Sequence, residues 1–178
     1  NFDLEKSHVL PAMIRKIYLA KLLNENKITE IMQNLGVSTK EAAIAILAKH
    51  QISQNHIELW GSGKPMREFL WSEDMADACV YIMERVNFKD LMPSGNEIRN
   101  THINIGTGED ISIKDVAFLV KEIVGYQGEI RFNSDKPDGT MKKLTDVSKL
   151  HALGWCHKMP LRTGIEQQYD WYLKQNHS

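Results

Sequence analysis

The stretch WGSGKPMREFLWSEDMADA, residues 60–78, places a single arginine, Arg67, between two apolar runs. A guanidinium presents a fork of N–H donors that matches phosphate oxygens, and it keeps its charge at every working pH. Trp60 offers a flat aromatic face on which a nucleobase or a sugar ring can rest. The pattern predicts a local site for a phosphorylated ligand. The alternative is an ordinary turn, in which Arg67 pairs with Glu68 or Asp74 and Trp60 lies in the core.

A second candidate is the loop KPDGT, residues 136–140, which has the composition of a turn. Pro137 fixes φ, and the Asp138–Gly139 pair favours the bend. The carboxylate of Asp138 is able to accept hydrogen bonds from the hydroxyl groups of a ribose or a hexose. A plain surface turn would explain the same residues without any ligand.

His8 and Lys16 are candidates on the first predicted helix, residues 7–24, which we expect Ser7 to cap. Extra positive charge is unfavourable at a helix N-terminus, and this suits the imidazole of His8 to proton transfer near neutral pH. Lys16 lies two helical turns later on a similar face, so the two side chains are able to share a site. An ordinary surface histidine is the alternative for His8.

Several catalytic signatures are absent from the sequence. GSG at residues 61–63 and GTG at residues 106–108 each follow an expected strand, but neither continues to a third spaced glycine, so a complete dinucleotide fingerprint is missing. There is no Walker A loop, no paired-cysteine zinc spacing and no G-x-S-x-G elbow, and the seven histidines show no metal-ligand spacing. We therefore expect no metal site and no self-sufficient active site.

The composition sets broad limits on function. The 178 residues include 22 Lys+Arg and 23 Asp+Glu, a balance that provides no general attraction to nucleic acid or to an anionic membrane. No apolar run is long enough to span a bilayer, and no signal peptide opens the sequence. The two cysteines, Cys79 and Cys156, fit a reducing, cytoplasmic setting, and Cys79 is expected to be buried. The first residue is Asn1, so we expect the chain to be part of a longer protein.

The hydrophobic pattern predicts about four short strands among five or six helices, a mixed α/β fold. A small helical insertion is expected at residues 22–56, with a capping box over STKE, residues 38–41. Its amphipathic helix is expected to pack on the domain, the alternative being contact with a partner subunit. Strands are expected at residues 56–60, 68–71, 101–106 and 129–132.

Helices are predicted from Ser72, over residues 112–125, and from after Pro160 to about residue 174. The buried stripe of the helix that begins at Ser72 is expected to consist of Met75, Ala78, Cys79, Ile82, Met83 and Val86. A polar loop with Pro93 and Gly95 is expected to follow it.

Taken in order, SHVLPAMIRK, WGSGKPMREFLWSEDMADA, HINIGTG and KPDGTMKKLTDVSKLHALGW resemble the C-terminal half of the GDP-L-fucose synthase family. Members of this family are extended short-chain dehydrogenases/reductases that act on sugar nucleotides. The resemblance runs from Asn1 to about Trp171 and is interrupted by residues 22–56. It implies that residues 1–178 are a small mixed α/β substrate-binding domain, without the Rossmann half of the enzyme.

The resemblance also implies roles for individual residues. His8 matches the family histidine that lies beside the NADP cofactor and acts as an acid/base in epimerisation. Lys16, Trp60, Arg67 and Asp138 match positions that contact the GDP-sugar, with Arg67 near the diphosphate. For the full-length enzyme the family implies 3,5-epimerisation and NADPH-dependent 4-reduction of GDP-4-keto-6-deoxy-D-mannose, and a homodimer.

The sequence departs from the family pattern in what it lacks. The glycine-rich NADP loop, the Tyr-x-x-x-Lys pair and the catalytic cysteine are absent, so this chain alone is expected to be inactive. Two alternatives stay open. One is the substrate domain of another NAD(P)-dependent sugar-nucleotide reductase, epimerase or dehydratase, and the other is a nucleotide-binding module without chemistry.

Overall fold

The computed structural model describes residues 1–92 and 98–176, so the loop predicted at Pro93 and Gly95 lies outside the described residues. The chain divides into two compact units. Unit 1 comprises residues 1–65, residues 112–141 and the chain from residue 165, and unit 2 comprises residues 66–111 and 142–164. Among the helices of the described ranges, none combines the length and the apolar character needed to cross a bilayer.

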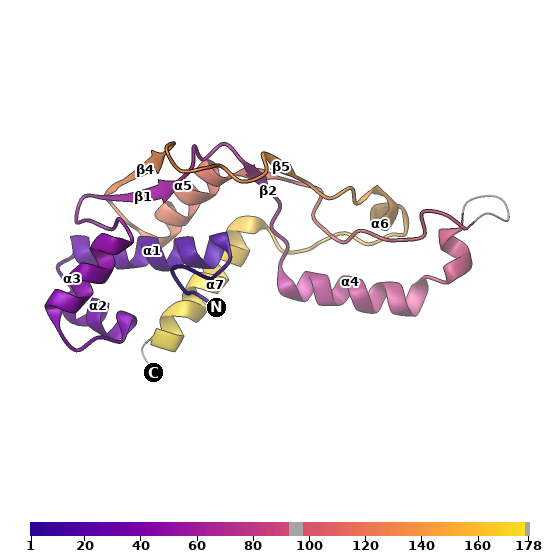
Figure 1. Cartoon of the computed structure of the whole chain (residues 1–178). Coiled ribbons are helices and arrows are strands. Elements are labelled where there is room, and N and C mark those ends of the chain that lie inside the picture. The colour runs from indigo at the N-terminus through magenta and orange to yellow at the C-terminus, as the bar shows by residue number, and fades with distance from the viewer. Residues whose placement is uncertain (93–97, 177–178) are drawn as a thin grey trace. The chain divides into compact units, whose positions relative to one another are not determined.

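Unit 1 is a two-stranded parallel sheet with helices around it. Strands β1 and β4 pair in register from His56↔Glu129 to Trp60↔Asn133. Helix α1 packs against α5 and against β1. Helix α2, which follows α1 in the chain, contacts both α1 and α3 (Figure 1). The elements of this unit are α1 (Val9–Asn24), α2 (Ile28–Leu35), α3 (Lys40–Lys49), β1 (His56–Trp60), α5 (Ile113–Val124), β4 (Glu129–Asn133) and most of α7 (Leu161–Asn176).

The core of unit 1 is built from the apolar faces of these elements. Fully buried side chains come from α1, β1, α5 and α7 and include Ile14, Ile17, Leu22, Ile57, Val116, Val120 and Ile165. Burial of one such side chain stabilises a fold by about 1.5–3 kcal/mol. An aromatic cluster joins α1 to α7, since Tyr18 makes edge contacts with both Tyr169 and Tyr172.

Unit 2 is smaller and contains very short strands. Strand β2 pairs in parallel with β5 through Met66↔Lys142 and Arg67↔Lys143, and the sheet order is β3-β2-β5. Ala78, Leu150 and Trp155 form its buried core. The elements are β2 (Met66–Arg67), α4 (Ser72–Arg85), a 3₁₀ turn η1 (Phe88–Leu91), β3 (Ile111–Ser112, with Ile111 in this unit), β5 (Lys142–Lys143) and α6 (Ser148–Ala152).

The elements with strong local signals are confirmed. Strands are present at His56–Trp60 and Glu129–Asn133, and α4 begins at Ser72. Ser112 caps α5 by accepting a hydrogen bond from the backbone N–H of Asp115 at 3.0 Å. The same helix ends at Gly125, whose φ of 78° is the left-handed conformation that glycine adopts at low cost.

Two predicted caps are wrong by one residue. The N-cap of α1 is His8 and not Ser7, whose hydroxyl donates to the carbonyl of Asp3 at 2.6 Å. The N-cap of α3 is Thr39 and not Ser38, and the Thr39 hydroxyl accepts from the N–H of Ala42 at 3.2 Å. At α3, Ser38 and Thr39 are both able to cap, so the sequence leaves the register open. At α1 the Ser7 hydroxyl is engaged by Asp3, and His8 occupies the N-cap position without a side-chain bond.

The strands predicted at residues 68–71 and 101–106 are also wrong. In the second of these segments, alternation puts Ile103 and Ile105 half-buried against the core of unit 2. A β-ladder also needs a neighbouring strand to exchange backbone hydrogen bonds. Among the described residues no such neighbour pairs with residues 101–106, so the segment is extended but is not part of a sheet.

The buried face of α4 is rotated from the predicted one. Ala78 is fully buried as expected, but Cys79 is exposed, and Met75 and Met83 are 40% and 80% exposed. Asp74 is buried instead, because its Oδ2 accepts hydrogen bonds from the backbone N–H groups of Lys158 and Met159 at 3.1 and 2.9 Å. The buried face of α4 thus contains a carboxylate with its hydrogen bonds made, where a methionine was expected.

Candidate functional site

Unit 1 contains a cavity of about 610 Å³. This volume lies within the range of roughly 300–1,000 Å³ that is typical of small-molecule sites. The cavity brings together Lys16 from α1 and Trp60 from the end of β1, two of the residues predicted to bind substrate. Its lining also includes Leu4, Glu5, Val9, Ala12, Met13, Lys49, His50, Gln51, Leu59 and Ile113.

Lys16 is the most deeply placed charge of this cavity. Its Nζ donates a hydrogen bond to the backbone carbonyl of Glu58 at 2.5 Å. Burial lowers the pKa of Lys16 to about 8, although the nearby Glu58 carboxylate favours the charged form. An ammonium group that has lost much of its hydration gains strongly from an anionic ligand, so Lys16 is suited to bind a phosphate.

Trp60 lies on the surface, with 69% of its area exposed. The alternative that placed Trp60 in the core is therefore wrong. The Nζ of Lys136 lies 5.4 Å from the centre of the indole ring, a cation–π arrangement. The ring is thus available to a ligand on a surface that already carries positive charge.

Asp138 is used within the chain. Its Oδ1 accepts a hydrogen bond from the backbone N–H of Ser62 at 2.8 Å, and its Oδ2 accepts from the Ser62 hydroxyl at 2.6 Å. These hydrogen bonds lower the pKa of Asp138. Gly61 makes room for the carboxylate, since a Cβ there would lie 2.4 Å from Oδ1. Asp138 therefore fixes the turn that follows Trp60, and its contact with a sugar hydroxyl stays a prediction.

His8 is exposed at the first turn of α1. It occupies the N-cap position without a side-chain capping bond, and its backbone carbonyl accepts from the N–H of Ala12 at 3.1 Å. Its neighbour Val9 lines the cavity. The acid/base role of His8 stays a prediction.

Arg67 belongs to unit 2, at the end of β2. Its Nη1 donates to the backbone carbonyl of Met66 at 2.7 Å. The next residue, Glu68, accepts hydrogen bonds from the backbone N–H groups of Thr107, Gly108 and Thr145 at 2.6, 2.7 and 3.1 Å. Burial acts to raise the pKa of Glu68, but these hydrogen bonds outweigh it and the pKa is lowered. Glu68 thus ties three segments of unit 2 together directly beside Arg67.

The arrangement around Glu68 explains the GTG segment that the sequence left without a role. The N–H groups of Thr107 and Gly108 form a small anion-binding nest, and the carboxylate of Glu68 fills it. A Cβ on Gly106 would lie 2.4 Å from Glu68 Oε1. These glycines therefore do not fit a cofactor pyrophosphate. Within the described ranges, no group of three or more His, Cys, Asp or Glu side chains is placed to hold a metal ion.

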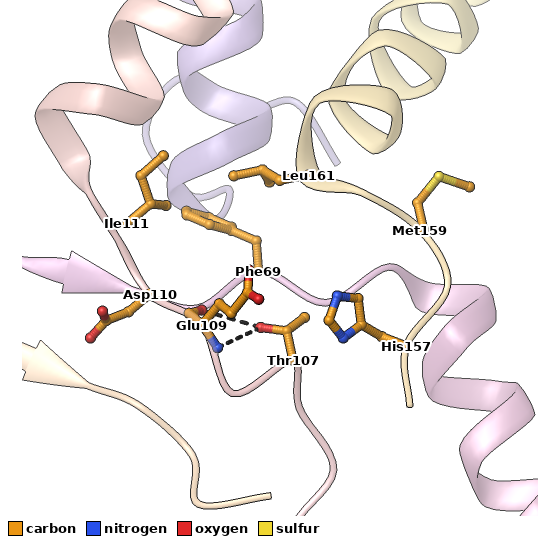
Figure 2. Close-up of a pocket in the computed structure, with 8 residues that line it drawn as sticks. All are labelled: Phe69, Thr107, Glu109, Asp110, Ile111, His157, Met159 and Leu161. Atoms are coloured by element: carbon orange, nitrogen blue, oxygen red, sulfur yellow. Dashed lines mark hydrogen bonds between the residues drawn. The ribbon is translucent and has the colours of Figure 1, made fainter. Parts of the chain in front are cut away.

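A smaller cavity of about 260 Å³ lies in unit 2. Figure 2 shows its apolar side, with Phe69, Ile111 and Leu161, and the Thr107 hydroxyl hydrogen-bonded to the backbone of Glu109. The carboxylate of Asp110 points away from His157, so these two side chains do not converge on one ligand (Figure 2). The volume is below the usual range for a nucleotide-sized ligand. The cavity of unit 1 is therefore the better candidate.

Sequence reasoning missed Ser62, Glu68 and His50. Ser62 and Asp138 are 76 positions apart, and Glu68 meets its partners 39 to 77 positions away, so neither contact has a local signature. The glycines at 61 and 106 are the available signal, because a close approach of a side chain requires a missing Cβ. No pattern in the sequence points to His50.

The sequence of this chain is similar to those of known proteins. The model of the NAD dependent epimerase/dehydratase family matches residues 1–106. GDP-L-fucose synthase 1 of Arabidopsis thaliana is 41% identical over 174 residues, which make up 98% of this chain and 42% of that protein. The chain thus spans less than half the length of this curated relative.

Two solved structures from Campylobacter jejuni are similar over 98% of this chain. One is a GDP-6-OMe-4-keto-L-xylo-heptose reductase, which is 51% identical with a TM-score of 0.93, and half of its chain is covered. The other is a GDP-D-glycero-L-gluco-heptose synthase solved in the presence of NADPH, which is 51% identical with a TM-score of 0.87, and 49% of its chain is covered.

Proposed function

This chain belongs to the NAD dependent epimerase/dehydratase family, and we propose that it is the substrate-binding portion of an enzyme acting on GDP-4-keto sugars. The first candidate activity is that of GDP-L-fucose synthase, which converts GDP-4-keto-6-deoxy-D-mannose to GDP-L-fucose. The observation that carries the proposal is the cavity of unit 1, where a buried ammonium and an exposed indole line one space. Relatives named GDP-L-fucose synthase support the identity of the ligand.

Binding energy at the nucleotide is the main contribution of this chain. The ammonium of Lys16 would bind a phosphate oxygen, and the face of Trp60 would support the base or the ribose. We propose that Arg67 contacts a diphosphate. Asp138 would position the turn next to Trp60, in addition to any contact with the sugar. Holding the distant nucleotide in this way orients the sugar ring for reaction.

His8 is the proposed acid/base of this chain. A ketone at C4 acidifies the hydrogens at C3 and C5, and an imidazole at the sugar is able to remove or return such a proton. General acid–base catalysis contributes typically about 10²–10⁴-fold in rate. NADPH supplies hydride to the C4 ketone in reductases of this kind. The described glycine loop does not fit that cofactor, so we expect NADP to be bound mainly outside residues 1–178, with His8 beside it.

A second candidate is the reduction of a GDP-4-keto-heptose at C4. The observation that favours it is identity, which reaches 51% with the two Campylobacter jejuni structures against 41% with the Arabidopsis thaliana relative. Rates of NADPH oxidation by the full-length protein, with GDP-4-keto-6-deoxymannose and with a GDP-4-keto-heptose, separate the two candidates. A preference for the heptose of tenfold or more selects the second.

Nucleotide binding by this chain is tested by calorimetry with GDP, UDP and dTDP. We expect GDP to bind most tightly, and Arg67→Ala and Trp60→Ala each to weaken GDP binding by about tenfold, as expected for a lost charge-assisted bond or stacking contact. Arg131→Ala is the matched control, because Arg131 is exposed and pairs with Glu129 on the surface. A preference for UDP or dTDP would contradict the assignment to a GDP-sugar.

The wider properties of the full-length enzyme are also proposals. We expect a cytoplasmic homodimer, as in the family that the sequence resembles. Size-exclusion chromatography with light scattering on the full-length protein measures the oligomeric state, and a monomer would contradict this expectation.

A further inference from the structure

We infer that the helical segment of residues 22–56 forms one wall of the nucleotide site, and that His50 contacts the diphosphate of the ligand. This inference rests on the proposed function, since it assigns a further ligand contact to the same cavity. From the sequence, this segment is expected to pack on the domain, with contact with a partner subunit as the alternative. In the structure three successive residues at the end of α3, Lys49, His50 and Gln51, line the cavity together with Lys16 and Trp60.

The backbone around His50 is held in one conformation. The N–H groups of His50 and Ile52 donate to carbonyls of α3 at 3.1 and 2.9 Å. Gln51 has a φ of 56°, which is the left-handed conformation that a residue with a side chain rarely adopts. Its carbonyl accepts from the N–H of Glu58 at 3.0 Å, which joins this turn to β1. The His50 side chain is therefore presented from a fixed turn and not from a loose loop.

Charge on this wall favours an anion. The ammonium groups of Lys16 and Lys49 and the carboxylate of Glu5 all act electrostatically on His50. Glu5 is the acid of the group, and it is paired with Lys49 at 2.5 Å. Arg15 also acts on His50, but its guanidinium donates to Asn34. Lys16 is the cation on this wall that lines the cavity without an ion pair to Glu5. A ligand phosphate that approaches Lys16 therefore approaches His50 as well.

His50 has hydrogen-bonding capacity to offer. Among the described residues, no hydrogen bond or ion pair engages its imidazole. Burial and the neighbouring Lys16 lower the pKa of His50, which favours the neutral form of the ring. A neutral imidazole carries one N–H donor, and this donor is able to reach a phosphate oxygen without adding a second charge to that of Lys16.

The test combines imidazole NMR with calorimetry on the 178-residue chain. We expect the ring signals of His50, assigned by their loss in His50→Ala, to shift on addition of GDP or pyrophosphate but not of guanosine. We also expect His50→Ala to weaken the binding of GDP and pyrophosphate by about tenfold, the usual cost of one hydrogen bond to a charged group. His151→Ala is the matched control, because His151 is an exposed histidine of α6 in unit 2.

The possible results distinguish the role of His50 from the proposed function of the chain. If the chain binds GDP while the His50 signals stay fixed and His50→Ala binds as tightly as the parent, the inference is wrong and the proposed function stands. If the parent chain binds neither GDP nor pyrophosphate, the proposed function fails, and this inference fails with it. Should His50→Ala not fold, His50→Gln retains a hydrogen-bonding side chain, and the NMR shifts of the parent chain still decide.

Discussion

Each unit contains a carboxylate that packs closely against a glycine and accepts hydrogen bonds from backbone N–H groups, but the two carboxylates differ in burial and in the number of donors. In unit 2 a Cβ added to Gly106 would lie 2.4 Å from an oxygen of Glu68. In unit 1 a Cβ added to Gly61 would lie 2.4 Å from an oxygen of Asp138. Glu68 is half-buried and accepts from the backbone of three residues in two distant segments. Asp138 is exposed and, within residues 1–92 and 98–176, accepts hydrogen bonds from Ser62 alone.

The two carboxylates have different roles, since Glu68 maintains the fold and Asp138 shapes a surface. Glu68 closes unit 2, whose core is small, so its loss leaves three partly buried donors without an acceptor. Asp138 orients one turn beside Trp60, on a unit whose core is already extensive. Glu68 follows the predicted ligand residue Arg67 in sequence, and Asp138 holds the turn that follows Trp60.

The largest expected effect is that of Glu68→Ala. Removal of the carboxylate leaves the N–H groups of Thr107, Gly108 and Thr145 unsatisfied, and we expect the free energy of unfolding to fall by about 3 kcal/mol. Urea denaturation followed by circular dichroism measures it. Glu129→Ala, which removes an exposed ion pair, is the control and leaves the midpoint nearly unchanged. An equal, small effect of both substitutions would refute the role given to Glu68.

Lys16 adds a pH dependence to unit 1. Its pKa of about 8 in the folded chain is below the ordinary value of 10.5, so burial of the ammonium costs stability below pH 8, and this cost disappears as the pH rises from about 8 to 10.5. The difference corresponds to about 3 kcal/mol at most. We expect Lys16→Met to be more stable than the parent at pH 7 and to bind GDP weakly. Unfolding curves that keep the same separation at pH 7 and pH 10 would contradict this.

Gly106→Ala tests the close approach in unit 2 without removing the carboxylate. The added Cβ forces Glu68 away from its donors, and we expect a loss of about 2 kcal/mol in unfolding free energy. Gly36→Ala is the matched control, because Gly36 has a positive φ of 68° but no atom within 4 Å of the added Cβ. It carries only backbone strain, about 1 kcal/mol. A Gly106→Ala variant no less stable than Gly36→Ala would rule out the proposed crowding.

Asp138→Ala is expected to have the smallest effect on stability. The exposed carboxylate contributes little to folding, so the unfolding midpoint should move far less than in Glu68→Ala. The turn at Gly61–Gly63 loses its anchor, however, and the fluorescence emission of Trp60 should change. A large fall in the unfolding midpoint would mean that the two carboxylates do not differ as described.

The parts of the fold that sequence predicted are those with local causes. Ser112 and Gly125 punctuate α5 so strongly that both ends are confirmed, and strands β1 and β4 follow from their apolar content. Residues 101–106 have the alternation of a strand, but strand formation depends on a partner that local pattern does not reveal. Strands β2 and β5 are two residues long and give no pattern at all.

The candidate site was predictable to a similar degree. Lys16 and Trp60 were identified from residue type and resemblance, and the structure brings both to one cavity. The use of Asp138 by Ser62 depends on a contact across 76 positions of sequence. His50 likewise lines the same cavity as Lys16, although the two residues lie on different helical segments. Side-chain contacts over such separations follow from the folded topology and not from composition.

The central claim is that the cavity of unit 1, with Trp60 at its edge, receives the guanine nucleotide. Titration of the 178-residue chain with GDP, followed by tryptophan fluorescence, tests it most directly, because 69% of Trp60 is exposed and a stacked base would change its emission. We predict a saturable change in the parent chain that is lost in Trp60→Phe. A change of equal size in both proteins, or none in the parent at millimolar GDP, would contradict the claim.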